Sequence, residues 1–384
     1  MKIVHVMLCG PITDGWSYQD NLLTKFHRKL GYEVTILTSQ WIWGEKGEFV
    51  RFERTNYQNE NDVKVIRLPI KGIDRFSRKF KRFDGFEKAL KLEEPDIIFV
   101  HGVSFCDAKV VVDYIRSHKT NRVYVDNHSD FSNSGSNWLS KNILHKLIWR
   151  HYAQMLNPYV RKFYGVLPAR VDWLVDMYKL PREKCELLVM GADDEKVKEA
   201  TAPEIRQQIR EKYRIQENDF LIMTGGKIDS AKVQTLQLME AVARIKEQRV
   251  KLIVFGSVTP ELLEQVKNRC VKNRVFYIGW VTSDESYKYF AAADLVVFPG
   301  RHSVFWEQVA GIGIPMLCKY WEGTTHVDLG GNVEFLKENS VTEIEEKIEE
   351  LVACPEKCNM MKKVAIEKGM ETFSYRKIAE RALS

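Results

Sequence analysis

The sequence predicts an α/β protein with two doubly wound domains, each built on a mainly parallel β-sheet. The chain has 384 residues, which is long for one hydrophobic core and suits two domains of roughly 150 to 200 residues each. Short apolar, β-branched segments alternate with amphipathic helical segments, a pattern typical of parallel strands joined by crossover helices. The alternation is interrupted once by a charged stretch and then begins again, so we expect two Rossmann-like domains.

The first half opens with a β-loop-α-β unit. Lys2–Leu8 is an apolar strand, Gly10–Gly15 is a turn-rich loop, and Ser17–Leu30 has apolar residues at helical spacing. Gly31 ends this helix, and Glu33–Thr38 is a second, β-branched strand. Further strands are expected at Val63–Leu68, Ile97–Val100, Val123–Val125, Gly165–Leu167 and Leu187–Val189.

The second series of strands follows a charged helical stretch that runs from Met190–Asp194 to Lys212, where we place the inter-domain linker. Its strands are expected at Phe220–Thr224, Leu252–Phe255, Val275–Ile278, Leu295–Phe298 and Pro315–Cys318. The predicted domains are residues 1–190 and 195–366, and the helical residues 367–384 are expected to pack back on the first domain. In such sheets ligands bind at the carboxyl ends of the strands.

Composition narrows the functional classes. The seven cysteines are scattered and never form C-x-x-C, which favours reduced thiols in the cytoplasm. Met1–Leu8 is too short for a secretory signal, and no apolar run reaches the roughly 18 residues of a membrane span. The net charge of +6 does not by itself indicate nucleic-acid binding, and no recognition motif is present. Cys354 and Cys358 lack further ligands nearby, so no metal site is expected.

The segment from Ile222 to Lys227 combines a strand end with Gly225 and Gly226, and Lys232 follows before a helix. Glycine lets a backbone approach a ligand closely, and a helix N-terminus favours anions. Two lysines on such a loop can hold a diphosphate. The alternative is a solvated surface loop.

A second constellation runs from Phe298 to Pro315, where a strand end leads into a small-residue loop and a short helix that carries Glu307. A carboxylate there can accept hydrogen bonds from both hydroxyl groups of a ribose, as acidic residues do in dinucleotide sites. The alternative is a glutamate that only stabilises the helix N-terminus.

In order and spacing, these segments resemble glycosyltransferase family 4, also called glycosyl transferases group 1, over nearly the whole chain. The matching segments are Gly10–Gly15, Gly31–Thr35, Glu94–Gly102, Met190–Asp193, Gly226–Lys227 with Lys232, Phe276–Val281 and Ala292–Leu295. The resemblance implies the GT-B fold, in which two Rossmann-like domains face each other across a cleft. A subgroup of bacterial surface-polysaccharide transferases is similar around residues 303–308 and 319–328.

The resemblance also implies roles for individual residues. Lys227 and Lys232 match the basic pair that neutralises the donor diphosphate, and Glu307 matches the second glutamate of the family's E-x7-E motif. His128 matches a histidine near the transferred sugar, with a structural histidine as the alternative. The catalytic residues expected are therefore His128, Lys227 and Lys232. The donor-binding residues expected are Gly15, Gly225, Gly226, Lys227, Lys232, Gly279, Trp280, His302, Ser303 and Glu307.

One departure from the family pattern concerns Pro299, which stands where the first glutamate of E-x7-E would fall. That glutamate lies near the donor sugar in the family, and His302 and Ser303 are the residues available to replace it here. No two aspartates are spaced as D-x-D, so lysines and helix dipoles rather than a metal are expected to hold the diphosphate. The family implies retention of anomeric configuration and no cofactor beyond the nucleotide-sugar donor. A UDP-sugar is the donor expected first, because UDP-sugars are the commonest donors in such families.

Two basic, aromatic segments suggest where the acceptor binds. Lys71–Lys91 carries eight Lys or Arg residues with Phe76, Phe80, Phe83 and Phe86, and Trp138–Lys162 carries five with no acidic residue. Such mixtures suit an anionic membrane, where a lipid-linked glycan acceptor would lie, so a peripheral location at the inner face of the plasma membrane is expected. The alternative is two amphipathic helices with their aromatic residues in the core.

Two other functions stay open. A sugar-nucleotide epimerase or a phosphorylase can share the fold, because fold does not fix function. A non-catalytic relative that only binds the nucleotide sugar is the alternative from another class, and Pro299 is its main support.

Overall fold

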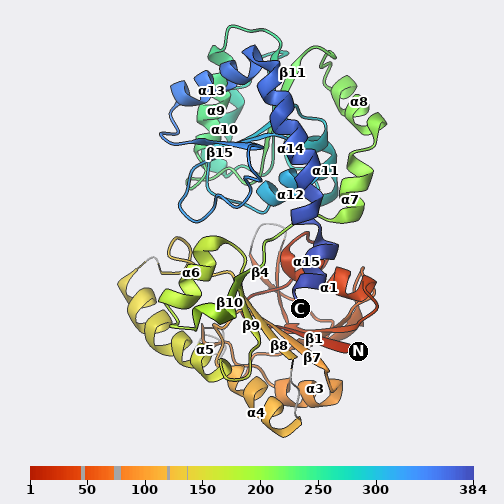
Figure 1. Ribbon diagram of the computed structural model, residues 1–384, viewed down its shortest axis with the longest axis vertical. Helices are drawn as coiled ribbons and strands as arrows, with labels where there is room; N and C mark the ends of the chain where they lie inside the picture. The colour runs from red at the N-terminus through yellow and green to blue at the C-terminus, as the bar shows by residue number, and fades with distance from the viewer. Residues whose placement is uncertain (45–47, 73–78, 119–121, 136) are drawn as a thin grey trace. The chain divides into compact units, whose positions relative to one another are not determined.

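The computed structural model describes residues 1–44, 48–72, 79–118, 122–135 and 137–384. The chain forms two compact units (Figure 1). Unit 1 consists of Met1–Val189 together with Ile378–Ser384, and unit 2 consists of Met190–Lys377. Among the described residues, no helix combines the length and the apolar character needed to cross a bilayer.

Unit 1 is built on an eight-stranded sheet in the order β10-β9-β8-β7-β1-β2-β6-β5, in which β5 alone runs antiparallel. Its strands are β1 (Lys2–Met7), β2 (Glu33–Ser39), β5 (Asn56–Gln58), β6 (Lys64–Leu68), β7 (Ile97–His101), β8 (Arg122–Asn127), β9 (Lys162–Gly165) and β10 (Cys185–Leu187). A small antiparallel pair, β3 (Trp41–Trp43) and β4 (Phe49–Arg51), lies outside this sheet. The strand order reverses between β1 and β7, and open α/β sheets bind their ligands at such a point.

The helices of unit 1 join these parallel strands. They are α1 (Gln19–Lys29), α3 (Phe86–Glu93), α4 (Ala108–His118), the π-helix η1 (Ser140–Trp149), α5 (Arg150–Leu156), α6 (Pro168–Asp176) and the short 3₁₀ helix η2 (Arg182–Lys184). The end of the last helix, α15 (Tyr375–Arg381), returns to unit 1 and lies against α1 (Figure 1).

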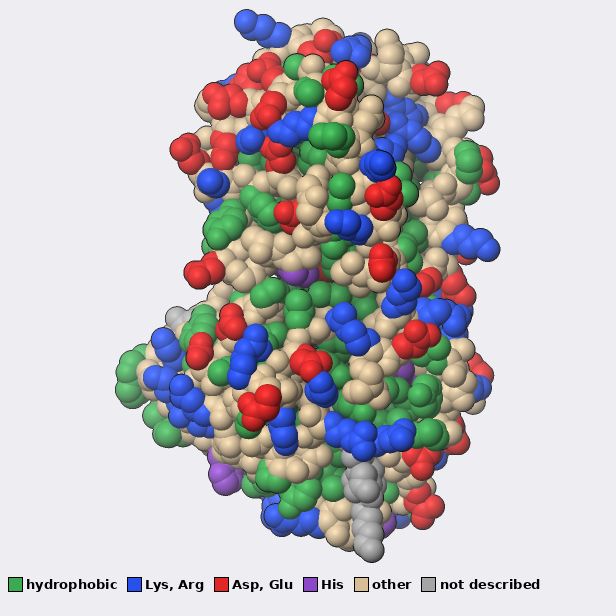
Figure 2. Space-filling model, viewed as in Figure 1, with side chains coloured by type: hydrophobic (Ala, Val, Ile, Leu, Met, Phe, Trp, Pro, Cys, Tyr) green, Lys and Arg blue, Asp and Glu red, His purple; other side chains and the backbone are tan. Residues whose placement is uncertain are grey.

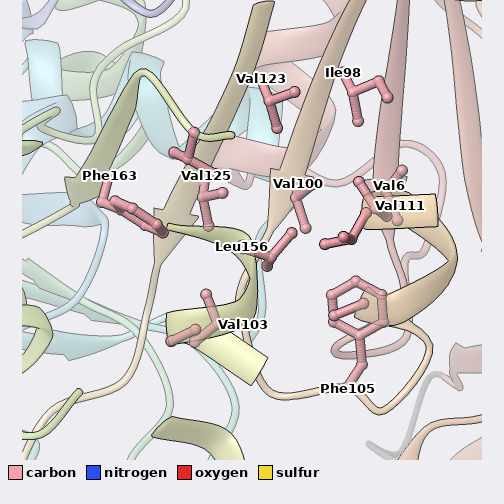
Figure 3. Packing of buried hydrophobic residues seen from close by; sticks show 14 of the residues in the cluster. Val6, Ile98, Val100, Val103, Phe105, Val111, Val123, Val125, Leu156 and Phe163 are labelled. Carbon is pink, nitrogen blue, oxygen red and sulfur yellow. The ribbon is translucent and has the colours of Figure 1, made fainter. Parts of the chain in front are cut away.

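The larger of the two hydrophobic clusters described in unit 1 lies on one face of its sheet, and a smaller one with Met7, Val34 and Val65 lies on the other. Val6, Ile98, Val100 and Val125 project from neighbouring strands and pack with Leu156 of α5 (Figure 3). Side chains alternate between the two faces of a strand. The residues between these valines and isoleucines therefore face the other way, and in β1 and β7 they include buried histidines.

Unit 2 repeats the architecture with six parallel strands in the order β13-β12-β11-β14-β15-β16. Its strands are β11 (Phe220–Gly225), β12 (Val250–Phe255), β13 (Val275–Tyr277), β14 (Leu295–Phe298), β15 (Met316–Lys319) and β16 (Val333–Leu336). Its helices are α7 (Asp194–Ala200), α8 (Pro203–Lys212), α9 (Gln234–Arg244), α10 (Pro260–Asn268), α11 (Ser283–Ala291), α12 (Phe305–Ile312), α13 (Val341–Ala353) and α14 (Pro355–Phe373). The strand order reverses between β11 and β14, which places the loops after these two strands at the ligand-binding position of the fold.

The predicted α/β class with two doubly wound parallel sheets is confirmed. The stretch expected to link the domains is helical and belongs to unit 2, where Arg206 and Arg210 both bind Asp294. Residues 367–377 also lie in unit 2, because α14 packs along α12, and only Ile378–Ser384 join unit 1.

Candidate functional site

The loop after β11 is held close to the loop after β12 by two glycines. Gly226 and Gly256 have φ angles of +125° and +123°, a region that other residues rarely adopt. A Cβ atom on Gly256 would lie 2.0 Å from the carbonyl oxygen of Gly226, so the backbones touch where no side chain fits. Gly226 N–H donates to the Phe255 carbonyl at 3.1 Å, and this bond fixes the turn that leads to Lys227.

Lys232 reaches back to this glycine loop. Its Nζ atom lies 4.0 Å from the point where a Cβ on Gly226 would stand. Burial lowers the pKa of Lys232 and the nearby charge of Lys227 lowers it further, while Asp229 acts in the opposite direction. Lys227 is largely exposed and lies 3.6 Å from Asp229. The two lysines therefore differ, since one is half-buried beside the glycine backbone and the other is free to reach into solvent.

A small pocket joins this loop to the loop after β14. Lys227 and Lys232 line the pocket together with Pro299, Arg301 and Ser303. Thr235, in the first turn of α9, also borders it. Val233, which precedes α9, has no side-chain oxygen to cap the helix N-terminus. Cationic side chains and a helix N-terminus thus meet at one small cavity, which is an environment for an anion.

Glu307 lies outside the lining of this pocket. Its side chain is fully buried in the first turn of α12, and its Oε1 atom accepts hydrogen bonds from His302 Nε2 at 2.9 Å and from His326 Nε2 at 2.8 Å. Burial would raise the pKa of Glu307, but the two histidines outweigh that effect and lower it to about 2. Its Oε2 atom is buried and has no partner among the described residues. A ribose can reach this carboxylate only if the side chains that cover it move.

Gly279 and Trp280 follow β13. The Gly279 carbonyl accepts a hydrogen bond from Gly256 N–H at 2.7 Å, so this loop is tied to the glycines of the pocket. Trp280 is 69% exposed, which leaves its indole ring available to a ligand and argues against a role in the core. Gly225 closes β11, where a Cβ atom would lie 2.3 Å from the Phe255 ring.

The two remaining expected site residues, Gly15 and His128, belong to unit 1. Gly15 N–H donates to Glu60 Oε1 at 2.8 Å. His128 follows β8, is 40% exposed, and places Nε2 3.5 Å from Oδ2 of the fully buried Asp126. Asp126 also lies 2.8 Å from His101 Nδ1, so an aspartate between two histidines stands at the carboxyl edge of the first sheet.

Unit 2 therefore brings together Gly225, Gly226, Lys227, Lys232 and Ser303 at one pocket, whereas Glu307 and His302 form a separate buried group with His326. The sequence analysis missed Arg301, Thr235 and His326, and in unit 1 it missed Asp126 and His101. Arg301 follows a strand at the switch point of the sheet, and that position was the only indication of its place in the pocket.

Comparison with known proteins finds a family domain within unit 2. Residues 205–368 match the family model described as glycosyl transferases group 1. The chain is 24% identical over 290 residues to an alpha-monoglucosyldiacylglycerol synthase from Streptococcus pneumoniae, and the match covers 71% of this chain and 64% of that protein. The chain thus spans less than two thirds of that relative.

Solved structures show the same fold. A glycosyltransferase from Rickettsia africae superposes with a TM-score of 0.70 at 14% identity, covering 100% of this chain and 96% of the other. Anabaena HepE, solved in complex with UDP, superposes with a TM-score of 0.68 at 16% identity, covering 99% and 98% of the two chains. These superpositions confirm the α/β fold class expected from the sequence, which solved glycosyltransferases share.

Proposed function

We propose, from the glycosyl transferases group 1 domain that this chain carries at residues 205–368, that the protein transfers a sugar from a nucleotide-diphosphate donor, with a UDP-sugar as the first candidate. The acceptor we propose is a glycan or a lipid-linked glycan of a bacterial surface polysaccharide. The observation that carries the proposal is the anion pocket between the loops after β11 and β14, with Lys232 half-buried beside the glycine backbone. Solved structures of HepE with UDP and with UDP-glucose support the choice of donor.

The chemistry proposed for this pocket is stabilisation of the leaving diphosphate. Negative charge grows on the diphosphate as the bond to the sugar breaks, and cationic groups fixed beforehand stabilise that charge most. Lys232, Lys227 and Arg301 supply the positive charge, and the N-terminus of α9 adds its dipole. These groups can take the place of a divalent cation, so we propose a metal-independent reaction.

A retaining reaction is proposed on the same basis. The acceptor hydroxyl attacks the face of the sugar from which the diphosphate leaves, and a leaving phosphate oxygen takes the hydroxyl proton. The enzyme then contributes mainly orientation and electrostatic stabilisation. His128 is proposed to contact the transferred sugar through its exposed ring.

Glu307 is proposed to act on the nucleotide ribose when the side chains that cover it move aside. Its free Oε2 atom is the available acceptor, because Oε1 already receives two hydrogen bonds. His302 and His326 hold the carboxylate ionised, and an ionised carboxylate is the stronger acceptor for hydroxyl groups.

The acceptor is proposed to be reached at an anionic membrane surface. Trp138, Leu139 and Leu147 are exposed at and beside η1, with side chains 71%, 54% and 61% accessible, and Lys141 and Lys146 lie on the same helix. Figure 2 shows hydrophobic and basic side chains intermixed on the face of unit 1 that carries α5. The other basic segment supports the proposal less, because Phe83 and Phe86 are buried in the core and Phe76 lies outside the described residues. The monoglucosyldiacylglycerol synthase, a relative named for a lipid product, is consistent with such an acceptor.

A non-catalytic nucleotide-sugar-binding protein is the second candidate, and the observation that favours it is Pro299 in the pocket lining. Such a binding protein would hold the nucleotide without transferring sugar to an acceptor, and so would a sugar-nucleotide epimerase.

A thermal-shift screen of nucleotide diphosphates and their sugar conjugates tests the proposal. A ligand at a hundred times its Kd stabilises the folded state by about 2.7 kcal/mol, which is readily detected. We expect UDP to raise the melting temperature and AMP to leave it unchanged. No stabilisation by any nucleotide diphosphate would contradict the proposed function, and binding without transfer to any extracted lipid or glycan would favour the second candidate.

A further inference from the structure

Three buried histidines of unit 1 form a row that ends at Asp126, the aspartate that also lies near His128. His27 of α1 contacts His5 of β1 through Nδ1 and Nε2, which lie 3.0 Å apart. His5 contacts His101 of β7 through Nδ1 and Nε2, which lie 2.9 Å apart. All three side chains are at most 5% exposed. Five contacts link these rings to each other and to their neighbours at the two ends, and two of them share the Nδ1 atom of His101.

Both ends of the row face oxygen atoms, a backbone carbonyl in a hydrogen bond at one end and two carboxylates in ion pairs at the other. At one end His27 Nε2 lies 3.0 Å from the carbonyl oxygen of Ala379, in α15. At the other end His101 Nδ1 lies 2.8 Å from Asp126 Oδ2 and 3.0 Å from Asp20 Oδ1. A carbonyl and an ionised carboxylate have no proton to donate, so the rings must supply the proton for both end contacts.

Proton counting then fixes the charge of the row. Four positions need one proton each: the two contacts between rings, the contact of His27 with Ala379, and His101 Nδ1, whose single proton faces both carboxylates. A neutral imidazole carries one N–H. Three neutral rings supply three protons, which leaves one contact with two lone pairs facing each other. A buried contact of that kind is costly, so the row is complete only with one additional proton.

The additional proton belongs on His101. Burial opposes a positive charge there, but Asp126 and Asp20 outweigh it and raise the pKa of His101 to about 10. Burial and the neighbouring charged ring lower the pKa of His5 and His27. With His101 doubly protonated, each ring donates through Nε2 toward Ala379, and the Nδ1 atoms of His5 and His27 accept.

Among the residues that the structure describes, the other groups near the row do not supply the missing proton by a direct hydrogen bond. Gln19 Nε2 lies 3.5 Å from Asp126 Oδ2, the Tyr32 ring stands edge-on to His27, and Cys9 lies near Asp20 and Asp126 with its pKa raised by burial. His128, on the far side of Asp126, is 3.5 Å from Oδ2. Two ligands of one metal ion at 2.0–2.2 Å lie roughly 3 Å or more apart, so the 2.8 Å contact of His101 with Asp126 favours a proton over an ion.

We propose that His27, His5 and His101 form one hydrogen-bonded chain holding a single excess proton, and that this chain fixes the Asp126 carboxylate beside His128. The three histidines are positioning residues, because they act on the site only through Asp126. The chain also ties the last helix of the protein to the carboxyl edge of the first sheet. The link from Asp126 to catalysis rests on the proposed function, whereas the protonation of the chain does not.

Nitrogen-15 NMR of the histidine-labelled wild-type protein tests the protonation directly. We expect one ring, assigned through His101→Gln, to carry protons on both nitrogens from pH 6 to pH 9. We expect the rings of His5 and His27 to be neutral, with the proton on Nε2. A His101 ring with a deprotonated Nδ1 in this range would overturn the proposal. Loss of the Nδ1 signal on addition of Zn²⁺ would overturn it too, because it would show a metal ligand in place of a protonated nitrogen.

A variant series tests whether the rings act as one unit. In His5→Phe the chain is cut, so His101 should lose its proton at a pH lower by about one unit or more. His5→Gln, which can still bridge its neighbours, should restore part of that shift, and His151→Gln, an exposed histidine of α5, should cause none. An unchanged His101 titration in a folded His5→Phe protein would overturn the chain. If the protein transfers sugar, the alkaline limit of kcat should move with the His101 titration in His5→Phe. A moved titration with an unmoved limit would overturn only the link to Asp126 and His128.

Discussion

His326 Nε2 donates a hydrogen bond to Glu307 Oε1 at 2.8 Å. The carboxylate is fully buried, and the same oxygen also accepts a hydrogen bond from His302. Hydrogen bonds to a charged group are worth about 1.5–3 kcal/mol each, so Glu307 stabilises unit 2 whether or not a nucleotide is present. Glu307→Gln keeps the shape and removes the charge. We expect it to lower the free energy of unfolding by about 2 kcal/mol, measured by urea titration.

The pH dependence of this effect has a defined sign. The pKa of Glu307 is depressed in the folded state, to about 2, so its stabilisation is present above the unfolded pKa of about 4.3 and is lost as the pH falls toward 2. Glu322→Gln, at an exposed position of the same unit, is the matched control. Equal stability of Glu307→Gln and Glu322→Gln at pH 7 would show that the histidine pair does not hold the carboxylate.

Gly256→Ala tests the close approach of the two loops. The added methyl group would lie 2.0 Å from the Gly226 carbonyl oxygen, at a φ angle of +123°. Relieving this clash must move the loop that carries Lys227, so we expect stability to fall by more than about 1 kcal/mol and UDP affinity to fall with it. Gly10→Ala is the control, because no described atom lies within 4 Å of its added Cβ. A Gly256→Ala protein with unchanged stability and UDP binding would contradict the geometry given for the pocket.

His145 should make unit 1 sensitive to mild acid. Its Nδ1 lies 2.9 Å from the Tyr178 hydroxyl, and burial, with the charge of Lys81, lowers its pKa to about 4. Below pH about 6.5 the His145 imidazole binds a proton in the unfolded chain but stays neutral in the folded chain. The free energy of unfolding therefore falls as the pH drops from 6.5 to 4. Each unit of pKa shift corresponds to about 1.4 kcal/mol.

The measurement is the urea midpoint as a function of pH. His145→Gln should flatten its decline between pH 6.5 and pH 4, whereas His151→Gln, at an exposed position of α5, should follow the wild type. A decline just as steep in His145→Gln would mean that this histidine does not couple protonation to folding.

Membrane binding should depend on both the charge and the apolar side chains of η1. Each basic residue near an anionic surface contributes about 1 kcal/mol, so Lys141→Gln with Lys146→Gln should weaken binding to phosphatidylserine vesicles roughly thirtyfold. Trp138→Ser with Leu147→Ser should weaken binding to anionic vesicles too, and Met360→Ser, an exposed residue of unit 2, should not. Sedimentation that is the same with and without anionic lipid would remove the membrane proposal.

Most strands were predictable because their β-branched residues are buried on both faces of a parallel sheet, as in β2 and β11. The strand expected at Gly165–Leu167 is instead β9 at Lys162–Gly165, since the apolar run continues past the strand into α6. The short strands β3, β4, β5 and β16 were missed. Three of them, β4, β5 and β16, contain charged or amide side chains, unlike the equally short but apolar β13 and β14. The π-helix η1 reads from its sequence as an ordinary helix.

The candidate site was partly predictable. The glycine loop and its lysines stood out because glycine and lysine together after a strand suit phosphate binding, with a solvated surface loop as the alternative. The histidine row was not predictable, because His5, His27 and His101 are far apart in the chain and meet only through the pairing of β1 with β7 and the packing of α1. The burial of Glu307 also depended on His326, which lies 19 residues away.

The most direct test of the proposed sugar transfer is turnover of a UDP-sugar by Lys232→Ala, compared with Lys251→Ala, a half-buried lysine near the amino end of β12. Loss of one preorganised group that stabilises charge typically lowers kcat by about 10² to 10³. We expect that loss in Lys232→Ala, with an unchanged melting temperature, and wild-type turnover in Lys251→Ala. A folded Lys232→Ala protein that transfers sugar at the wild-type rate would contradict the assignment of this pocket to the donor diphosphate.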